Sequence, residues 1–454
     1  MKPNRLWPVL LLATSATSLA ASLDVKPIAF TERQLANGLQ VLAIENHASP
    51  TVSVQVWYHV GSKDDPAGRS GFAHLFEHLM FKSTQNLKPE QFDRLTEDVG
   101  GSNNAFTAPD VTAYHEVVPS NHLQTILWAE AERMSNLKID EPNFKSERAV
   151  VQEEYRQRVL ASPYGRLFNG IDPAAYQVHP YKRPGIGSIE DLDAASVADV
   201  VAFHKTYYRP DNATLVVAGD FEPKQLQAWI DQYFSRIKRP VEAIPQVTVQ
   251  EPVWASDRHV QLTGPQVPLP AIAIVWQAPP VSNSDAPALK VAAAILSAGD
   301  SSRLNQALVY RGQMASQTGF EADLRKGTGL LTAYAMAASG KTLSDIGKVL
   351  EEQVKALASK TVSQAELDKV KTTLLTQALV ERQTPLGQAS ALADAAVQLG
   401  DAKQFNSALA ALQKVTATDV QRVMKRYVAS AHKVSVSYTQ EPKAQESVKK
   451  EAAQ

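Results

Sequence analysis

The sequence contains no cysteine among its 454 residues. Disulfide bonds and thiolate metal sites are therefore excluded, and any bound metal must be held by histidines and carboxylates. The formal net charge of −1 gives no electrostatic case for binding nucleic acid or an acidic membrane surface. Beyond the N-terminal region no stretch approaches about 18 consecutive apolar residues, so we expect the rest of the chain to be soluble and to have no membrane span.

The N-terminal residues are typical of a secretory signal peptide. Lys2 and Arg5 provide a basic start, Leu6–Ala13 is a short apolar run, and Ser18-Leu19-Ala20 resembles a small-residue cleavage site. We expect residues 1–21 to be removed, which would place the mature protein in the periplasm or outside the cell. Retention of this run as an anchor is the alternative, although it is too short to span a membrane.

The length is comfortable for two domains of about 200 residues each. Arg239–Trp254 is rich in proline and β-branched residues and is interpreted as a linker. The sequence predicts an α+β protein of two homologous α/β-sandwich halves, each an antiparallel sheet with helices packed on it. The predicted organisation is a signal peptide at 1–21, an N-terminal domain at 25–238, a linker at 239–255, a C-terminal domain at 256–441 and a disordered tail at 442–454.

The order of predicted elements before the linker is repeated after it. Alternating and β-branched runs predict strands at 30–35, 39–45, 51–60, 103–107, 111–118, 213–218, 271–277, 317–322, 329–337 and 433–438. Apolar periodicity and caps predict helices at 70–82, from 89, from 120, from 140, ending near 208, at 222–237, at 286–297, and from 342, 363 and 416.

His74-Leu75-Phe76-Glu77-His78 spells H-x-x-E-H, the inverzincin signature. Positions i and i+4 of a helix share a face, so His74 and His78 can present two imidazoles to one Zn²⁺. Glu77 lies beside the same face, where its carboxylate can take a proton from a zinc-activated water.

A hydrolytic zinc site needs a third protein ligand, and we expect it to be Glu154, which follows His78 by 76 positions (154 − 78). Its surroundings read as a helix, with Asp140 as the N-cap and a proline in the first turn. Glu147 lies two turns earlier on the same face and could orient a ligand from behind. A solvated acidic face that includes Glu147, Glu153 and Glu154 is the alternative, but the two stretches together favour a metal site.

At this point the sequence resembles the M16 (pitrilysin, or inverzincin) metallopeptidases, in particular the short subfamily that includes the mitochondrial processing peptidase. The resemblance covers nearly the whole mature chain and is carried by GSKDDPAGRSGFAHLFEHLMFKST, GGSNNAFTAPDVTAYHEVVP, ERAVVQEEY, HPYKRPGIGSIEDL and YYRPDNATLVVAGDF. It implies that zinc is bound by His74, His78 and Glu154, that Glu77 is the general base, and that Glu147 belongs to the zinc environment.

The resemblance also implies where a peptide substrate would lie. Asn103–Thr107 matches the family's edge strand near the zinc, along which a peptide could add as an extra strand. We expect Asn104 and Ala105 to touch the substrate, whereas Phe106 is interpreted as an ordinary strand residue.

The second half departs from the family pattern. Active single-chain or homodimeric members carry an Arg and a Tyr seven positions apart after SSRL, and these groups bind the substrate carbonyl and the developing oxyanion. Here Ser301–Leu304 is present, but Val309 and Ser316 stand where the pair would be. A one-residue shift could let Tyr310 or Arg311 substitute, but neither restores the spacing.

Three functions remain open. The chain could be the zinc-binding subunit of an endopeptidase whose homologous partner supplies the Arg/Tyr pair, in a heterodimer. It could be a self-sufficient, homodimeric peptidase with a divergent oxyanion donor. It could also be a non-catalytic structural subunit, although a degenerate scaffold has no chemical reason to keep all four residues of a zinc site.

Overall fold

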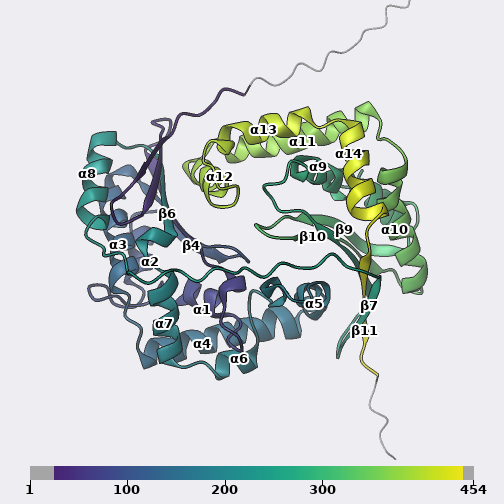
Figure 1. The fold of residues 1–454 in the computed structure, drawn as a ribbon, viewed down its shortest axis with the longest axis horizontal. Helices are drawn as coiled ribbons and strands as arrows, with labels where there is room; N and C mark the ends of the chain where they lie inside the picture. Colours follow the sequence, from purple (N-terminus) through teal and green to yellow (C-terminus); the bar gives the residue numbers. More distant parts are fainter. Residues whose placement is uncertain (1–24, 443–454) are drawn as a thin grey trace, which may run out of the picture.

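Two β-sheets with their helices stand side by side in the computed structural model, which describes residues 25–442 (Figure 1). The predicted signal peptide and the tail from residue 443 onward lie outside the described residues. No helix within 25–442 combines the length and the hydropathy needed to cross a membrane.

The first sheet has the strand order β1-β2-β6-β3-β5-β4. Its strands are Thr31–Gln34 (β1), Gln40–Glu45 (β2), Thr51–Tyr58 (β3), Ser102–Thr107 (β4), Thr112–Pro119 (β5) and Ala213–Gly219 (β6). A tight turn joins β1 to β2, and Gly38 supplies the positive φ of 96° that this turn requires. β6 lies between β2 and β3, and it is parallel to β2 and antiparallel to β3.

The second sheet repeats this topology in the order β7-β11-β8-β10-β9. Its strands are Arg258–Gly264 (β7), Ala271–Ala278 (β8), Ala315–Asp323 (β9), Gly329–Ala337 (β10) and Lys433–Gln440 (β11). β11 is parallel to β7 as β6 is parallel to β2, and the remaining neighbours in both sheets are antiparallel. The two halves therefore share one fold, as the order of predicted elements indicated, and each sheet contains one parallel pair that the prediction of antiparallel sheets did not include.

Helices cover both sheets. In the first half they are Phe72–Leu79 (α1), Gln91–Glu97 (α2), Leu123–Asn136 (α3), Glu141–Tyr155 (α4), Gly165–Ala175 (α5), Ile189–Asp193 (α6), Val197–Tyr207 (α7) and Pro223–Phe234 (α8). In the second half they are Ala286–Ser297 (α9), Leu343–Ser359 (α10), Gln364–Glu381 (α11), Pro385–Val397 (α12), Gln404–Lys414 (α13) and Ala417–Met424 (α14). α1 and α9 occupy equivalent places in the chain, because α1 lies between β3 and β4 and α9 lies between the matching strands β8 and β9.

Each half sends one helix to the sheet of the other half. α12 packs against β3 and β6, and its Leu392 is fully buried with Leu42 and Val216 of the first sheet. In the reverse direction α5 packs against β7 and β11, and Leu167 lies in one apolar cluster with Val434. Both helices lie between the two sheets in Figure 1. The apolar cores therefore cross the boundary between the two halves.

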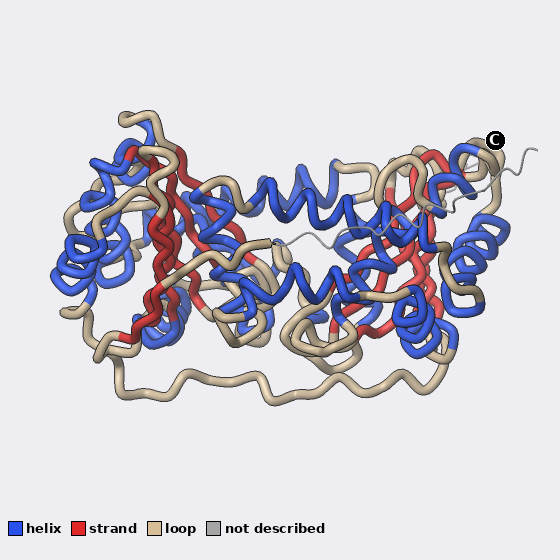
Figure 2. The backbone as a smooth tube through the Cα atoms, turned by 90° about the horizontal axis from the view of Figure 1, so that it is seen from above, coloured by secondary structure: helices blue, strands red, loops and turns tan. Residues whose placement is uncertain are grey.

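The segment between α8 and β7 contains no helix or strand and runs along one side of the molecule from one sheet to the other (Figure 2). Arg209 fixes its beginning by donating to the backbone carbonyls of Glu242 and Pro240 at 2.8 and 2.7 Å. Glu251 fixes its end by accepting backbone N–H groups from residues 177–179. The predicted linker is thus an extended but anchored segment.

Candidate metal centre

α1 presents the H-x-x-E-H motif because its other face is apolar and buried. Phe72, Leu75 and Phe76 are 0% exposed against the first sheet and α7, which turns the motif side chains away from the core. The carboxylate of Asp65 caps the helix, accepting the N–H groups of Gly71 and Ala73 at 2.7 and 2.9 Å. Burial raises the pKa of Asp65 to about 7, although these two N–H groups oppose the shift.

α4 packs against α1 and brings its carboxylates to the histidines. Glu154 Oε2 lies 3.1 Å from His74 Nε2 and 3.3 Å from His78 Nε2. Asp140 caps α4 by accepting the N–H of Asn143, as the sequence predicts. Two helices, α1 and α4, therefore bring the three candidate ligands together, and each helix is capped at its N-terminal end.

The spacing of these atoms fits a tetrahedral zinc ion. One ligand atom from each of His74, His78 and Glu154 lies within 4.8 Å of the other two. Zinc binds nitrogen and carboxylate oxygen at about 2.0–2.2 Å, so two ligand atoms of a tetrahedron are about 3.3–3.6 Å apart. The distances of 3.1 and 3.3 Å from Glu154 Oε2 to the two imidazole nitrogens are close to this range. Two histidines and a carboxylate are also a donor set found in catalytic zinc sites, where the fourth position stays open.

The pKa shifts of His74 and Glu154 are those expected of a site that binds a cation. Burial lowers the pKa of His74, but the carboxylates of Glu154 and Glu77 outweigh it and raise that pKa to about 9. Hydrogen bonds from His74 and His78 hold the pKa of Glu154 well below its usual range. The cluster thus carries an excess of negative charge that a proton or a metal ion must balance, and metal binding would displace the proton from His74.

Glu77 is held beside the cluster. Thr107 of β4 donates its hydroxyl to Glu77 Oε2 at 2.7 Å, and His74 Nδ1 lies 3.3 Å from the same oxygen. Burial raises the pKa of Glu77, but these two contacts outweigh it and lower the pKa below the usual value. Within residues 25–442 the other oxygen of Glu77, Oε1, has no hydrogen-bond partner of this kind. Thr107 was not among the predicted site residues.

The acidic side chains of α4 point to different sides of the helix. Glu147 is buried, with Oε1 bound to Lys82 Nζ at 2.9 Å and Oε2 at 3.8 Å from His78 Nδ1, as expected for a group behind the ligands. The side chain of Glu153 is 56% exposed and pairs with Arg156 at 3.4 Å on the solvent side. Glu154 and Glu147 therefore face the histidines, and Glu153 does not.

A hollow of about 280 Å³ adjoins the cluster at the open edge of the first sheet. It is lined by Glu77, His78, Phe81, Asp93, Asn103 and Asn104. Its wall is β4, which is the edge strand that the resemblance implied.

The residues expected to touch substrate differ in their positions. Asn104 lines the hollow, and its Oδ1 accepts the N–H of Ala105 at 2.8 Å, so it covers that edge group. The side chain of Ala105 packs against the core. Phe106 lies edge-on against Trp57, which supports its interpretation as a structural residue. Asn103 also lines the hollow, although it was not predicted.

The second half offers no equivalent catalytic groups at the corresponding positions. Val309 lies in the π-helical turn Asn305–Tyr310, and Ser316 lies on β9, where its hydroxyl is 3.5 Å from the carbonyl of Met336. The side chain of Tyr310 is 51% exposed. Neither position carries the guanidinium or the phenol of the family pattern.

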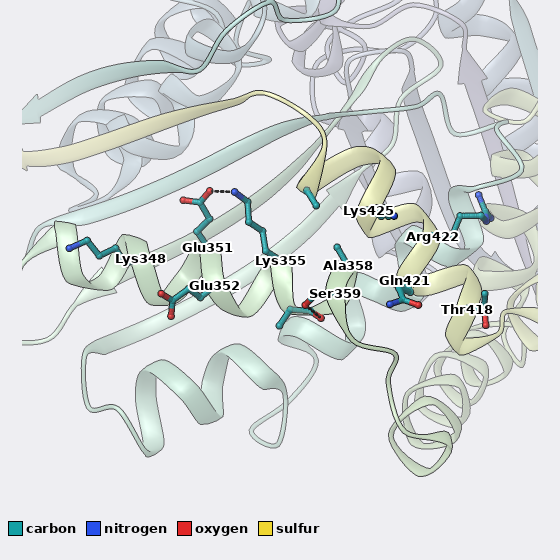
Figure 3. Close-up of a pocket in the computed structure, with 12 residues that line it drawn as sticks. Lys348, Glu351, Glu352, Lys355, Ala358, Ser359, Thr418, Gln421, Arg422 and Lys425 are labelled. Atoms are coloured by element: carbon teal, nitrogen blue, oxygen red, sulfur yellow. Dashed lines mark hydrogen bonds and ion pairs between the residues drawn. The ribbon is translucent and has the colours of Figure 1, made fainter.

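A larger groove of about 1070 Å³ lies on the second half between α10 and α14 (Figure 3). Its charged groups are partly paired with one another: Glu351 is bound by Lys355 at 2.7 Å and also by Lys433. Arg422 is bound to Asp285 at 2.6 Å. None of the metal-cluster residues lines this groove.

Comparison with known proteins identifies the class. Residues 40–188 match the sequence profile described as Insulinase (Peptidase family M16), and residues 194–374 match the profile of the Peptidase M16 inactive domain. With this match and the two-sheet fold, the chain belongs to the M16 peptidase family.

Individual relatives agree with this class. The zinc protease PqqE of Helicobacter pylori is 33% identical over 369 residues, which cover 80% of this chain and 82% of that protein. The probable mitochondrial-processing peptidase subunit beta of Arabidopsis thaliana is 24% identical over 403 residues, covering 87% and 75%. A crystal structure of a protease from Helicobacter pylori has a TM-score of 0.88 at 29% identity and covers 92% of this chain and 100% of that one.

Proposed function

We propose that this protein is a zinc-dependent endopeptidase that cleaves extended or unstructured peptides. The observation that carries the proposal is the cluster of His74, His78 and Glu154 with ligand atoms within 4.8 Å, beside the oriented carboxylate of Glu77. The names of the related zinc proteases support the same metal and reaction.

The chemistry follows from the positions of the side chains. Zinc held by His74, His78 and Glu154 would supply a Lewis acid that lowers the pKa of a water and polarises the scissile carbonyl. Glu77 keeps Oε2 on Thr107 and offers Oε1 to accept the proton of that water and to return it to the leaving amine. A peptide lying along β4 would bring its backbone to this point, since an open strand edge offers unpaired N–H and C=O groups.

The substitution Glu77→Gln tests the mechanism. It keeps the size and the hydrogen bond from Thr107 but removes the base, and loss of a general base costs about 10²–10⁴ in rate. We expect zinc near one per chain, retained peptide binding and almost no turnover with an unstructured fluorogenic peptide. Normal turnover by this variant would refute the assigned role of Glu77.

We further propose that a homologous subunit completes the site. Val309 and Ser316 cannot donate as an Arg/Tyr pair would, and one preorganised oxyanion donor is worth about 2.7–4 kcal/mol. The name of the mitochondrial-processing relative describes that protein as a subunit. A self-sufficient homodimer and a non-catalytic structural subunit are the competing functions.

The partner hypothesis is tested with the isolated chain, after size-exclusion chromatography has excluded a second protein. We expect peptide cleavage at least about 10²-fold slower than in a complex with an Arg/Tyr-bearing homologue. Val309→Arg with Ser316→Tyr should recover part of the activity if the second half faces the zinc. Robust turnover by the isolated chain that Glu77→Gln abolishes would show that the chain is complete alone.

We also propose that the protein is located in the periplasm or outside the cell, on the basis of residues 1–21, and cell fractionation tests this.

A further inference from the structure

Both carboxylates of α4 that face the histidines are bound from behind by a cation. Glu154 directs Oε2 to the two imidazoles, while its Oε1 is bound to Arg158 Nη1 at 2.6 Å. Glu147 directs Oε2 towards His78 and gives Oε1 to Lys82. In each carboxylate the two oxygens thus have different partners, one on the metal side and one on the outer side.

Within residues 25–442 the side chain of Arg158 has one ion pair, which is the contact with Glu154. It lies four residues after Glu154, where α4 widens into the π-helical turn Arg156–Ala161. The side chain of Arg158 is 73% exposed, whereas that of Glu154 is 16% exposed. A side chain so exposed contributes little packing, so its short contact with Glu154 is its main interaction.

The partner of the second oxygen of Glu154, Oε1, matters for a catalytic metal. A carboxylate can bind a metal ion with one oxygen or with two, and a second bound oxygen would raise the coordination number. A hydrolytic site must keep one position open for water or substrate. The groups that hydrogen-bond a ligating carboxylate are therefore part of the site, and their loss commonly costs about 10–100-fold in metal affinity or activity.

We propose that Arg158 is a positioning residue that restrains Glu154 to one-oxygen metal binding and thereby keeps the fourth coordination position open. The inference rests on the proposed function, because it takes Glu154 as the third ligand. Lys82 has the corresponding relation to Glu147, but that carboxylate is buried, so removing Lys82 would also destabilise the fold. Arg158 is exposed, so replacing it can test the positioning of Glu154 without a large loss of folding stability.

The test uses the full chain loaded with Co²⁺ in place of zinc, because four-coordinate Co²⁺ absorbs visible light more strongly than five-coordinate Co²⁺. We expect Arg158→Gln to keep about one metal per chain, to lose visible absorption intensity and to cleave peptide about 10–100-fold more slowly. Arg158→Lys should restore most of the spectrum and activity. The matched control is Arg156→Gln, which removes the equivalent contact to Glu153 and should change neither.

The outcomes distinguish the inference from the proposed function. Unchanged Co²⁺ absorption and turnover in Arg158→Gln, with metal loss in Glu154→Gln, would overturn the role of Arg158 and leave the zinc site in place. Full metal content in Glu154→Gln would overturn the ligand assignment itself. Equal spectral changes in Arg158→Gln and Arg156→Gln would show a general charge effect and would also overturn the inference.

Discussion

The substitution Arg133→Met should strongly destabilise the N-terminal half. Arg133 of α3 is fully buried and binds two carboxylates that are also fully buried, Glu116 of β5 and Glu130 of its own helix. The guanidinium lies over the rings of Phe92 and Tyr114, at 4.1 and 4.4 Å from their centroids. Methionine would fill much of the space but would leave the two acids without a counter-charge.

The magnitude follows from this burial. Removing one member of a buried ion cluster costs about 3–5 kcal/mol, because the remaining charge is neither solvated nor paired. Replacing all three residues by apolar ones of similar volume is often neutral or stabilising. We therefore expect Arg133→Met to lose about 3–5 kcal/mol of unfolding free energy, and Arg133→Met combined with Glu116→Leu and Glu130→Met to regain most of it.

Chemical denaturation as a function of pH provides the assay. Burial and the nearby Glu130 raise the pKa of Glu116 well above its usual value although Arg133 opposes the rise, so removing Arg133 should raise this pKa further. Such a carboxyl has a higher pKa in the folded state than in the unfolded state, where the pKa is about 4.3. As the pH rises above about 4.3, the group therefore lowers the free energy of unfolding. The deficit of Arg133→Met relative to wild type should therefore shrink as the pH falls from about 8 to about 5. A loss below about 1 kcal/mol, or a deficit independent of pH, would refute the reasoning.

Three further predictions concern single contacts. Glu154→Gln should lower bound zinc well below one per chain while Glu153→Gln should not, as metal analysis of the purified variants can show; the opposite pattern would mean that the wrong carboxylate was assigned. Thr107→Val should keep zinc but reduce kcat by about tenfold, because the free Glu77 oxygen loses its orientation; unchanged kinetics would show that the hydroxyl is dispensable. Leu392→Ala should lower the unfolding free energy by about 2–5 kcal/mol in a denaturation experiment, since this side chain is fully buried on the sheet of the other half; a neutral result would contradict the tight packing of α12.

Elements whose residues carry a local signal could be predicted from the sequence. The helix of His74 and His78 is set by its apolar face, and α4 by its Asp140 cap and early proline. Such signals also placed the strands of the first sheet and the helix Ala286–Ser297. The spacing of the motif predicted which side chains would meet, because a shared helix face is a local property.

Features that depend on contacts distant in the sequence were not predicted. β7 has a weak alternating pattern, and its identity depends on parallel pairing with β11, far along the chain. α5, α12 and α13 were missed because their short apolar faces are broken by proline, glycine or polar residues. The role of Thr107 was missed for a related reason: its hydroxyl reaches Glu77 only once β4 lies beside α1.

The exchange of α5 and α12 between the two sheets has a consequence for chain connectivity. If the backbone were cut within residues 239–255, each fragment alone would expose the sheet face that the other fragment's helix covers. The two fragments should therefore be insoluble or unfolded when produced separately, yet should assemble when produced together, because the surfaces that recognise each other are core surfaces. In this molecule the peptide between the halves acts as a tether that raises the local concentration of each half around the other, while the crossed helices α5 and α12 hold the two halves together.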